Sequence, residues 1–115
     1  MTKSYKFSIP VRPKAKGRPR VTSKNGNMWA YTPKTTRDWE ETVRHYYKGP
    51  KFDGPVSMTI TLSSKRAVVT ITPLDCETSP LRGDISNYVK GIEDALNGLA
   101  YDDDRQIHRL VGKKK

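Results

Sequence analysis

The sequence contains little cysteine and no long apolar run. Cys76 is its one cysteine in 115 residues, so the chain forms no internal disulfide and suits a reducing compartment. No Cys or His stands near it at zinc-ligand spacing, which argues against a structural zinc site. Only 34% of the residues are hydrophobic, and no stretch of them is long enough to cross a bilayer. The first ten residues lack the apolar segment of a signal peptide. We therefore expect a soluble cytoplasmic protein that does not bind membranes.

Acidic residues are missing from the first third of the chain. Positions 1–37 contain ten Lys or Arg and no Asp or Glu, and the formal net charge of the chain is +10. This excess predicts a polyanionic partner. Eight of the twelve acids lie from Asp75 onward, which favours an enzyme that holds a divalent cation beside a phosphodiester. The plainer alternative is a basic protein that its charge keeps soluble.

The length favours one domain, and the hydrophobic patterns predict a mixture of helices and strands. Alternation predicts a strand over 56–62, a return strand over 67–72 after a turn at 65–66, and a first strand over 5–11. Further strands are expected at 18–21 and 28–31, as a hairpin around Asn25–Gly26, and at 106–111. Helices are expected from Thr32–Pro33 to about Lys48 and from Ile85 to Leu96. We expect an α+β fold in which a small mixed sheet packs against the two helices.

Two features of the first half suggest different roles. Trp39, Val43 and Tyr46 or Tyr47 recur at helical spacing, and such a stripe is more often core than a base-stacking surface. The loop before the predicted hairpin is rich in Lys, Arg, Gly and Pro, and its cations suit contacts with DNA phosphates. The DNA-binding candidates are Lys14, Lys16, Arg18, Arg20 and Lys24.

The helix predicted over 85–96 separates an apolar side from a polar side. The apolar side contains Ile85, Tyr88, Val89, Ile92, Ala95 and Leu96, and the polar side contains Ser86, Asn87, Lys90 and Asp94. Asp84 stands at the N-cap position, where its carboxylate is expected to accept backbone N–H bonds. Taken singly, Asp84 is most often a cap, and Lys90 with Asp94 is most often a solvated pair.

Three adjacent acids follow the helix, and they favour a functional interpretation of these residues over a purely structural one. Asp102, Asp103 and Asp104 come after a connection short enough to return alongside the helix. Adjacent carboxylates repel one another unless they are solvated, paired or bound to a cation. A solvated turn is one interpretation. The other is a magnesium site between the helix start and the turn, with Lys90 stabilising charge on a phosphate.

Three blocks of this region resemble the RusA family of Holliday junction resolvases, which are common in phages and prophages. They run Gly83-Asp-Ile-Ser-Asn-Tyr-Val-Lys90, then Glu93-Asp-Ala-Leu-Asn-Gly98, then Tyr101-Asp-Asp-Asp-Arg-Gln-Ile107. The family pattern has Asp-x-Asp-Asn-x-x-Lys, then Asp-Ala-Leu, then Asp-Asp-x-Gln. The early Lys-Gly-Arg-Pro-Arg and Tyr-Thr-Pro-Lys segments also look like phage members.

The resemblance implies a homodimeric nuclease that binds four-way junctions and branched DNA and nicks two opposed strands. It implies Mg²⁺, with Mn²⁺ as an alternative, in the cytoplasm of a bacterial or phage-infected cell. Asp84, Asp103 and Asp104 match metal-ligand positions, and Lys90 matches the catalytic lysine. Asn87 matches an asparagine beside the site.

The sequence departs from the family pattern in two places. Ser86 replaces the second aspartate of the first block, so a neutral oxygen stands where the pattern has an anionic one. Asp102, Asp94 or a water would have to compensate. The family pattern also continues into a further strand after Lys115. Ser86 favours one alternative, a weakened or inactive DNA-binding protein. A basic RNA-binding or ribosome-associated protein is a second alternative, which would explain the charge but would leave the acidic cluster without a role.

Overall fold

We describe the fold from a computed structural model of the 115-residue chain. The structure describes the backbone of residues 3–15, 20–24, 27–31 and 33–115, and the side chains of residues 3–15 and 33–115. The chain divides into two compact units, residues 1–75 and 76–115. Each unit is described by itself.

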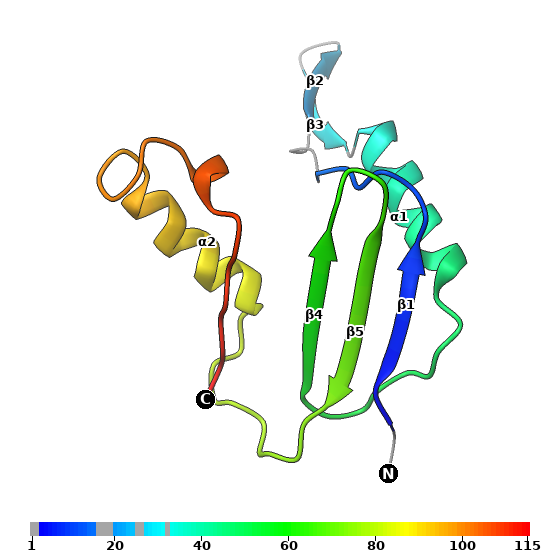
Figure 1. The fold of residues 1–115 in the computed structure, drawn as a ribbon. Helices are drawn as coiled ribbons and strands as arrows, with labels where there is room; N and C mark the ends of the chain where they lie inside the picture. Colours follow the sequence, from blue (N-terminus) through cyan, green and yellow to red (C-terminus); the bar gives the residue numbers. More distant parts are fainter. Residues whose placement is uncertain (1–2, 16–19, 25–26, 32) are drawn as a thin grey trace. The chain divides into compact units, whose positions relative to one another are not determined.

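The first unit contains a three-stranded antiparallel sheet in the order β1-β5-β4 (Figure 1). Its strands are β1 (Tyr5–Ile9), β4 (Val56–Leu62) and β5 (Ala67–Pro73). β5 is central, and its Val69 lies opposite Phe7 on one side and Ile60 on the other. The alternating pattern of the sequence therefore predicted all three strands. The sheet is antiparallel throughout its described strands, whereas we expected a mixed one.

Helix α1 (Lys34–Tyr46) packs against this sheet. Ile9, Ala67 and Val69 form the buried core. The partly buried apolar side chains packed against that core are Phe7, Trp39, Val43, Tyr46 and Ile71. The expectation of a core-facing stripe on this helix is therefore confirmed. Pro33 is the N-cap residue instead of the first helical residue, and the helix ends at Tyr46, before the Gly49–Pro50 pair.

The predicted hairpin is present as β2 (Arg20–Lys24) and β3 (Asn27–Tyr31). The two strands pair antiparallel, with Arg20 opposite Tyr31 and Lys24 opposite Asn27. The Asn25–Gly26 turn lies outside the described residues.

The second unit contains helix α2 (Ile85–Leu96) and a short 3₁₀ helix, η1 (Asp104–Gln106). The bounds of α2 are those that the sequence predicted. The strand expected over 106–111 is absent, so that prediction was wrong. Gln106 ends η1 instead, and its side chain accepts the backbone N–H groups of Asp102 and Asp103.

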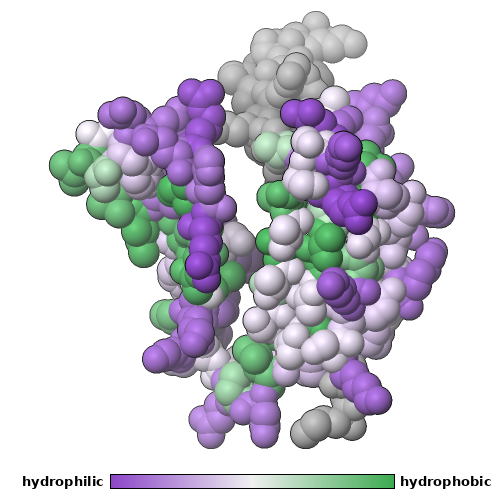
Figure 2. All heavy atoms as spheres, viewed as in Figure 1, coloured by the Kyte–Doolittle hydropathy of each residue, from purple (hydrophilic) through white to green (hydrophobic). Residues whose placement is uncertain are grey.

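Several large apolar side chains are exposed on each unit (Figure 2). On β4, Met58, Ile60 and Leu62 are each at least half exposed. On α2, Ile85 and Val89 are half-buried, whereas Tyr88, Ile92 and Leu96 are exposed. The sequence predicted that all of these α2 residues would face a core, and no residue of α2 is buried.

The architecture is α+β, as expected from the sequence, with two helices and an antiparallel sheet. No helix in the described part of the chain is long and apolar enough to span a membrane.

Replacement of Ile9 should test the core directly. Ile9 is 1% exposed, so Ile9→Ala removes buried methylenes and leaves a cavity, at a cost of about 2–4 kcal/mol. Ile60→Ala is the matched control, because Ile60 is 50% exposed and its loss should cost less than about 1 kcal/mol. Urea unfolding measures both values, and equal losses would contradict this description of the core.

Candidate active site

Asp84 is the N-cap residue of α2, as the sequence predicted, but its side chain does not cap the helix. Its backbone oxygen accepts the first helical bonds, from the backbone N–H groups of Asn87 (3.0 Å) and Tyr88 (3.3 Å). The expectation that the Asp84 carboxylate accepts backbone bonds was therefore wrong. Among the described residues, no hydrogen bond or ion pair reaches this exposed carboxylate, which leaves its oxygens available to a ligand.

The residue before Asp84 is held by Tyr88. The backbone N–H of Gly83 donates to the Tyr88 hydroxyl at 3.2 Å. A Cβ added at Gly83 would lie 2.9 Å from Cε2 of the Tyr88 ring. A larger residue at position 83 would therefore have to displace the Tyr88 ring.

The chain reverses direction after α2. Gly98 has φ +82°, a conformation that glycine adopts without strain, and its N–H donates to the Tyr101 carbonyl at 2.7 Å. The Tyr101 hydroxyl donates to the Glu93 carbonyl at 2.7 Å, which ties the returning segment to the helix. Burial, followed by the nearby Glu93 charge, raises the pKa of Tyr101. We did not predict a role for Tyr101 from the sequence, where its one signal is an aromatic residue directly before the acidic run.

Asp103 caps η1. Its carboxylate accepts the Arg105 backbone N–H at 3.1 Å and the Arg105 Nε–H at 3.0 Å. Together with Gln106 it forms a capping box. The Arg105 backbone bond is the main cause that lowers the pKa of Asp103. Both oxygens of this predicted metal ligand are therefore already engaged.

Lys90 contacts three acids. Its Nζ lies 3.0 Å from Asp104 Oδ2, 3.3 Å from Asp94 Oδ1 and 4.0 Å from Glu93 Oε2. The hydrogen bond to Asp104 is the largest cause that raises the pKa of Lys90, followed by the bond to Asp94. The Lys90 side chain is still 50% exposed. The ammonium is therefore charged, fixed in position and open to a ligand.

The structure thus brings together two of the predicted site residues, Lys90 and Asp104, which are fourteen positions apart. Among the described residues, no hydrogen bond or ion pair connects Asp84 to either of them. The possible accessory residues Ser86, Asn87 and Asp102 are exposed.

The carboxylates of this region can be compared with the ligands that Mg²⁺ prefers. The described residues hold no group of three His, Cys, Asp or Glu side chains arranged for a metal. Mg²⁺ commonly uses only one or two carboxylates, and completes its shell with waters and substrate phosphates. Asp84, whose carboxylate has no described partner, and Asp104, of which only Oδ2 is bonded, fit that donor chemistry. Asp103 fits it less well, because Arg105 holds both of its oxygens.

Few of the predicted DNA-binding residues can be placed. Lys14 is exposed. Arg20 and Lys24 lie at opposite ends of β2, and only their backbone is described. Lys16 and Arg18 lie outside the described residues.

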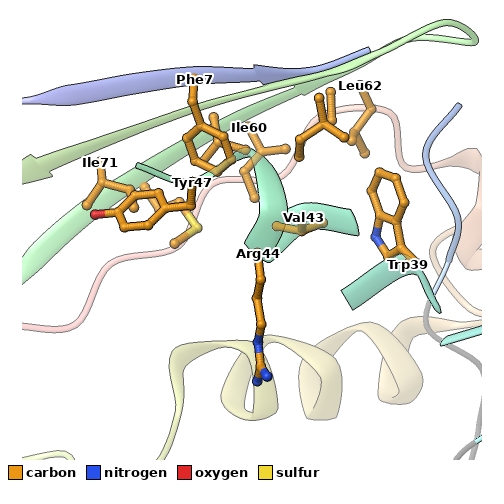
Figure 3. Close-up of a pocket in the computed structure, with 12 residues that line it drawn as sticks. Phe7, Trp39, Val43, Arg44, Tyr47, Ile60, Leu62 and Ile71 are labelled. Carbon is orange, nitrogen blue, oxygen red and sulfur yellow. The ribbon is translucent and has the colours of Figure 1, made fainter. Parts of the chain in front are cut away.

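The first unit contains an apolar pocket of about 710 Å³ between α1 and the sheet (Figure 3). Phe7, Ile60 and Trp39 are among the apolar residues that line it, and Arg44 is its one charged lining residue among those described. In Figure 3 the Arg44 guanidinium points away from these apolar side chains. Among the described residues that line it, the pocket has no carboxylate, and its polar side-chain groups are those of Arg44, Trp39 and Tyr47.

Comparison with known proteins identifies the family. A family model described as Endodeoxyribonuclease RusA matches residues 10–115. The chain belongs to the RusA endodeoxyribonuclease family. It is also 31% identical over 124 residues to an uncharacterized Bacillus subtilis (strain 168) protein, YqaN, with 95% of this chain and 85% of that protein covered. No solved structure matches the chain.

The region that matches the RusA family includes the acidic turn. The match includes Asp84, Lys90 and Asp104. In the structure, Lys90 and Asp104 come from two separate blocks of the resemblance, and their side chains meet at 3.0 Å.

The pKa of Lys90 tests this geometry without any assay of activity. The ion pair raises the folded-state pKa above the usual 10.5, so its stabilising effect is complete below pH 10.5 and is lost as the pH rises through the folded value. We expect an NMR titration of the Lys90 Cε signal to show a midpoint above 10.5 that falls in Asp104→Asn. Asp53→Asn is the control and should leave the midpoint unchanged. An unaltered midpoint in Asp104→Asn would contradict the pairing.

Proposed function

We propose that the chain is a structure-selective DNA endonuclease that resolves Holliday junctions and other branched DNA in recombination and repair. Its membership in the RusA family supports the reaction class. The observation that carries the proposal is the contact between Lys90 and Asp104, because it joins two separated blocks of the family pattern in one site. Symmetric paired nicks require two matched sites, so the proposed active form is a homodimer.

Lys90 is the proposed phosphate-binding group. An ammonium has three N–H donors, and those of Lys90 face Asp104 at 3.0 Å and Asp94 at 3.3 Å. The remaining donor and the exposed half of the side chain can reach a phosphate oxygen. Because the two acids fix the ammonium before DNA binds, it can stabilise charge that develops on the phosphate without rearranging.

Asp84 and Asp104 are the proposed ligands of Mg²⁺, with Mn²⁺ as the alternative ion. When bound, this cation supplies an activated water and stabilises the leaving oxygen. Asp103 is a further proposed ligand, and it would first have to release Arg105. Ser86, which is exposed beside Asp84, contributes a neutral oxygen.

The basic residues of the first unit are the proposed DNA-binding surface. Among them, Lys14 is exposed, and the chain carries ten Lys or Arg without an acid over positions 1–37. Binding through phosphate contacts releases counterions, so affinity for DNA should fall steeply with salt.

One specific observation favours a second candidate function. Ser86 stands where the family pattern has an aspartate, which would lower the affinity for metal. The alternative is therefore a catalytically weakened RusA-family protein that binds junctions without cleaving them efficiently.

A nicking assay on a synthetic four-way junction separates these functions. We expect the wild-type chain to nick the junction only when Mg²⁺ or Mn²⁺ is present. Asp104→Asn should lower the rate by about a hundredfold or more, because it removes both a metal ligand and the partner of Lys90, while junction binding by gel shift is retained. Asp53→Asn, an exposed acid of the first unit, is the control for charge.

Two outcomes of this assay would contradict the proposed nuclease. Full cleavage by Asp104→Asn would refute the assigned site. Junction binding by the wild-type chain without nicking in either metal would favour the weakened protein.

A further inference from the structure

The last described residues of the chain lie along the start of α2 (Figure 1). Gly112 packs against the helix so closely that an added Cβ would lie 3.1 Å from Val89 Cγ2 and 3.4 Å from Ile85 Cδ1. This contact places the following residues beside the loop that leads into Asp84.

Two side chains connect the segment 112–115 to that loop. The Lys114 ammonium donates to the backbone carbonyls of Leu81 at 3.2 Å and Gly83 at 3.1 Å. The Ser79 hydroxyl donates to the Lys115 carbonyl at 2.8 Å and accepts the Leu81 N–H at 3.1 Å. Residues more than thirty positions apart are therefore joined by several bonds.

Lys114 differs from an ordinary solvated lysine. In the part of the chain that the structure describes, no carboxylate lies within ion-pair distance of it. Its charge is directed instead at two backbone carbonyls, and charge-assisted bonds of this kind are about twice as strong as neutral ones.

The Gly83 carbonyl belongs to the peptide that enters Asp84. This peptide region is held on both sides, since the Gly83 N–H bonds to the Tyr88 hydroxyl at 3.2 Å and the Gly83 oxygen bonds to Lys114 at 3.1 Å. The Asp84 carboxylate itself has no described partner that would fix it. Its direction therefore depends on the backbone on which it stands.

We propose that Lys114 is a positioning residue, which holds the 81–83 loop through its carbonyls and so presents the Asp84 carboxylate to the metal. The inference rests on the proposed function, because it concerns the same site. It gives Lys114 a role other than contact with DNA, although a lysine-rich segment is usually expected to bind the DNA backbone.

The test compares three variants of the full chain. Lys114→Met removes the ammonium and keeps a long apolar stem, and Lys114→Arg restores a donor. Lys113→Met is the matched control, because it removes the same charge from the neighbouring position. Mn²⁺ is titrated in the absence of DNA and followed by electron paramagnetic resonance, and amide hydrogen exchange of Gly83 is measured by NMR without metal.

We expect Lys114→Met to weaken Mn²⁺ binding by about tenfold, the smaller end of the effect of residues that support metal ligands. Amide exchange of Gly83 should accelerate in the same variant. Lys114→Arg should recover most of both properties, and Lys113→Met should change neither. An Asp84→Asn background should abolish the effect of Lys114→Met on Mn²⁺ affinity.

Two results would overturn the inference. Unchanged Mn²⁺ affinity and unchanged Gly83 exchange in Lys114→Met would remove the positioning role. Equal losses of DNA affinity in Lys114→Met and Lys113→Met, with Mn²⁺ affinity preserved, would assign Lys114 to the DNA backbone instead. Failure of the proposed function would give a different result, because the wild-type chain itself would then fail to nick junctions in either metal.

Discussion

The ion pair between Lys90 and Asp104 is the interaction that organises the candidate site in the second unit. Three adjacent aspartates repel one another, and the structure resolves this repulsion residue by residue. Asp104 pairs with Lys90 at 3.0 Å, Asp103 pairs with Arg105 at 3.0 Å, and Asp102 is exposed to solvent. Because Lys90 stands on α2 and Asp104 opens η1, the same ion pair that relieves the repulsion also joins the helix to the acidic turn.

The sequence predicted the elements whose side chains follow a clear period. The strand over 56–62 and the helix over 85–96 have the predicted bounds. The strand expected over 106–111 did not form: Gln106 belongs to a 3₁₀ helix, where its side chain accepts two backbone N–H bonds, and residues 107–111 have no regular secondary structure. The exposure of Ile92 on α2 and Ile60 on β4 was not predictable, because periodicity indicates which side is apolar but not what covers it.

The candidate site could be only partly predicted, since its residues had to be recognised before their contacts were known. The family pattern selected Asp84, Lys90, Asp103 and Asp104, and the structure shows that their side chains have different partners. The Asp84 side chain does not cap α2, although local propensity predicted a cap there, and the Asp103 side chain caps η1, which was not predicted. The bonds from Lys114 to the Leu81 and Gly83 carbonyls left no signal in the sequence, because backbone carbonyls are present at every position.

The central claim is that Lys90 and Asp104 act as one catalytic unit, and a double-mutant cycle tests it most directly. Single-turnover nicking of a four-way junction would be measured for Lys90→Met, Asp104→Asn and the double variant. Residues that work together lose their effect together, so the account predicts that the double variant is no slower than the slower single variant. Losses that multiply across the two positions would contradict it.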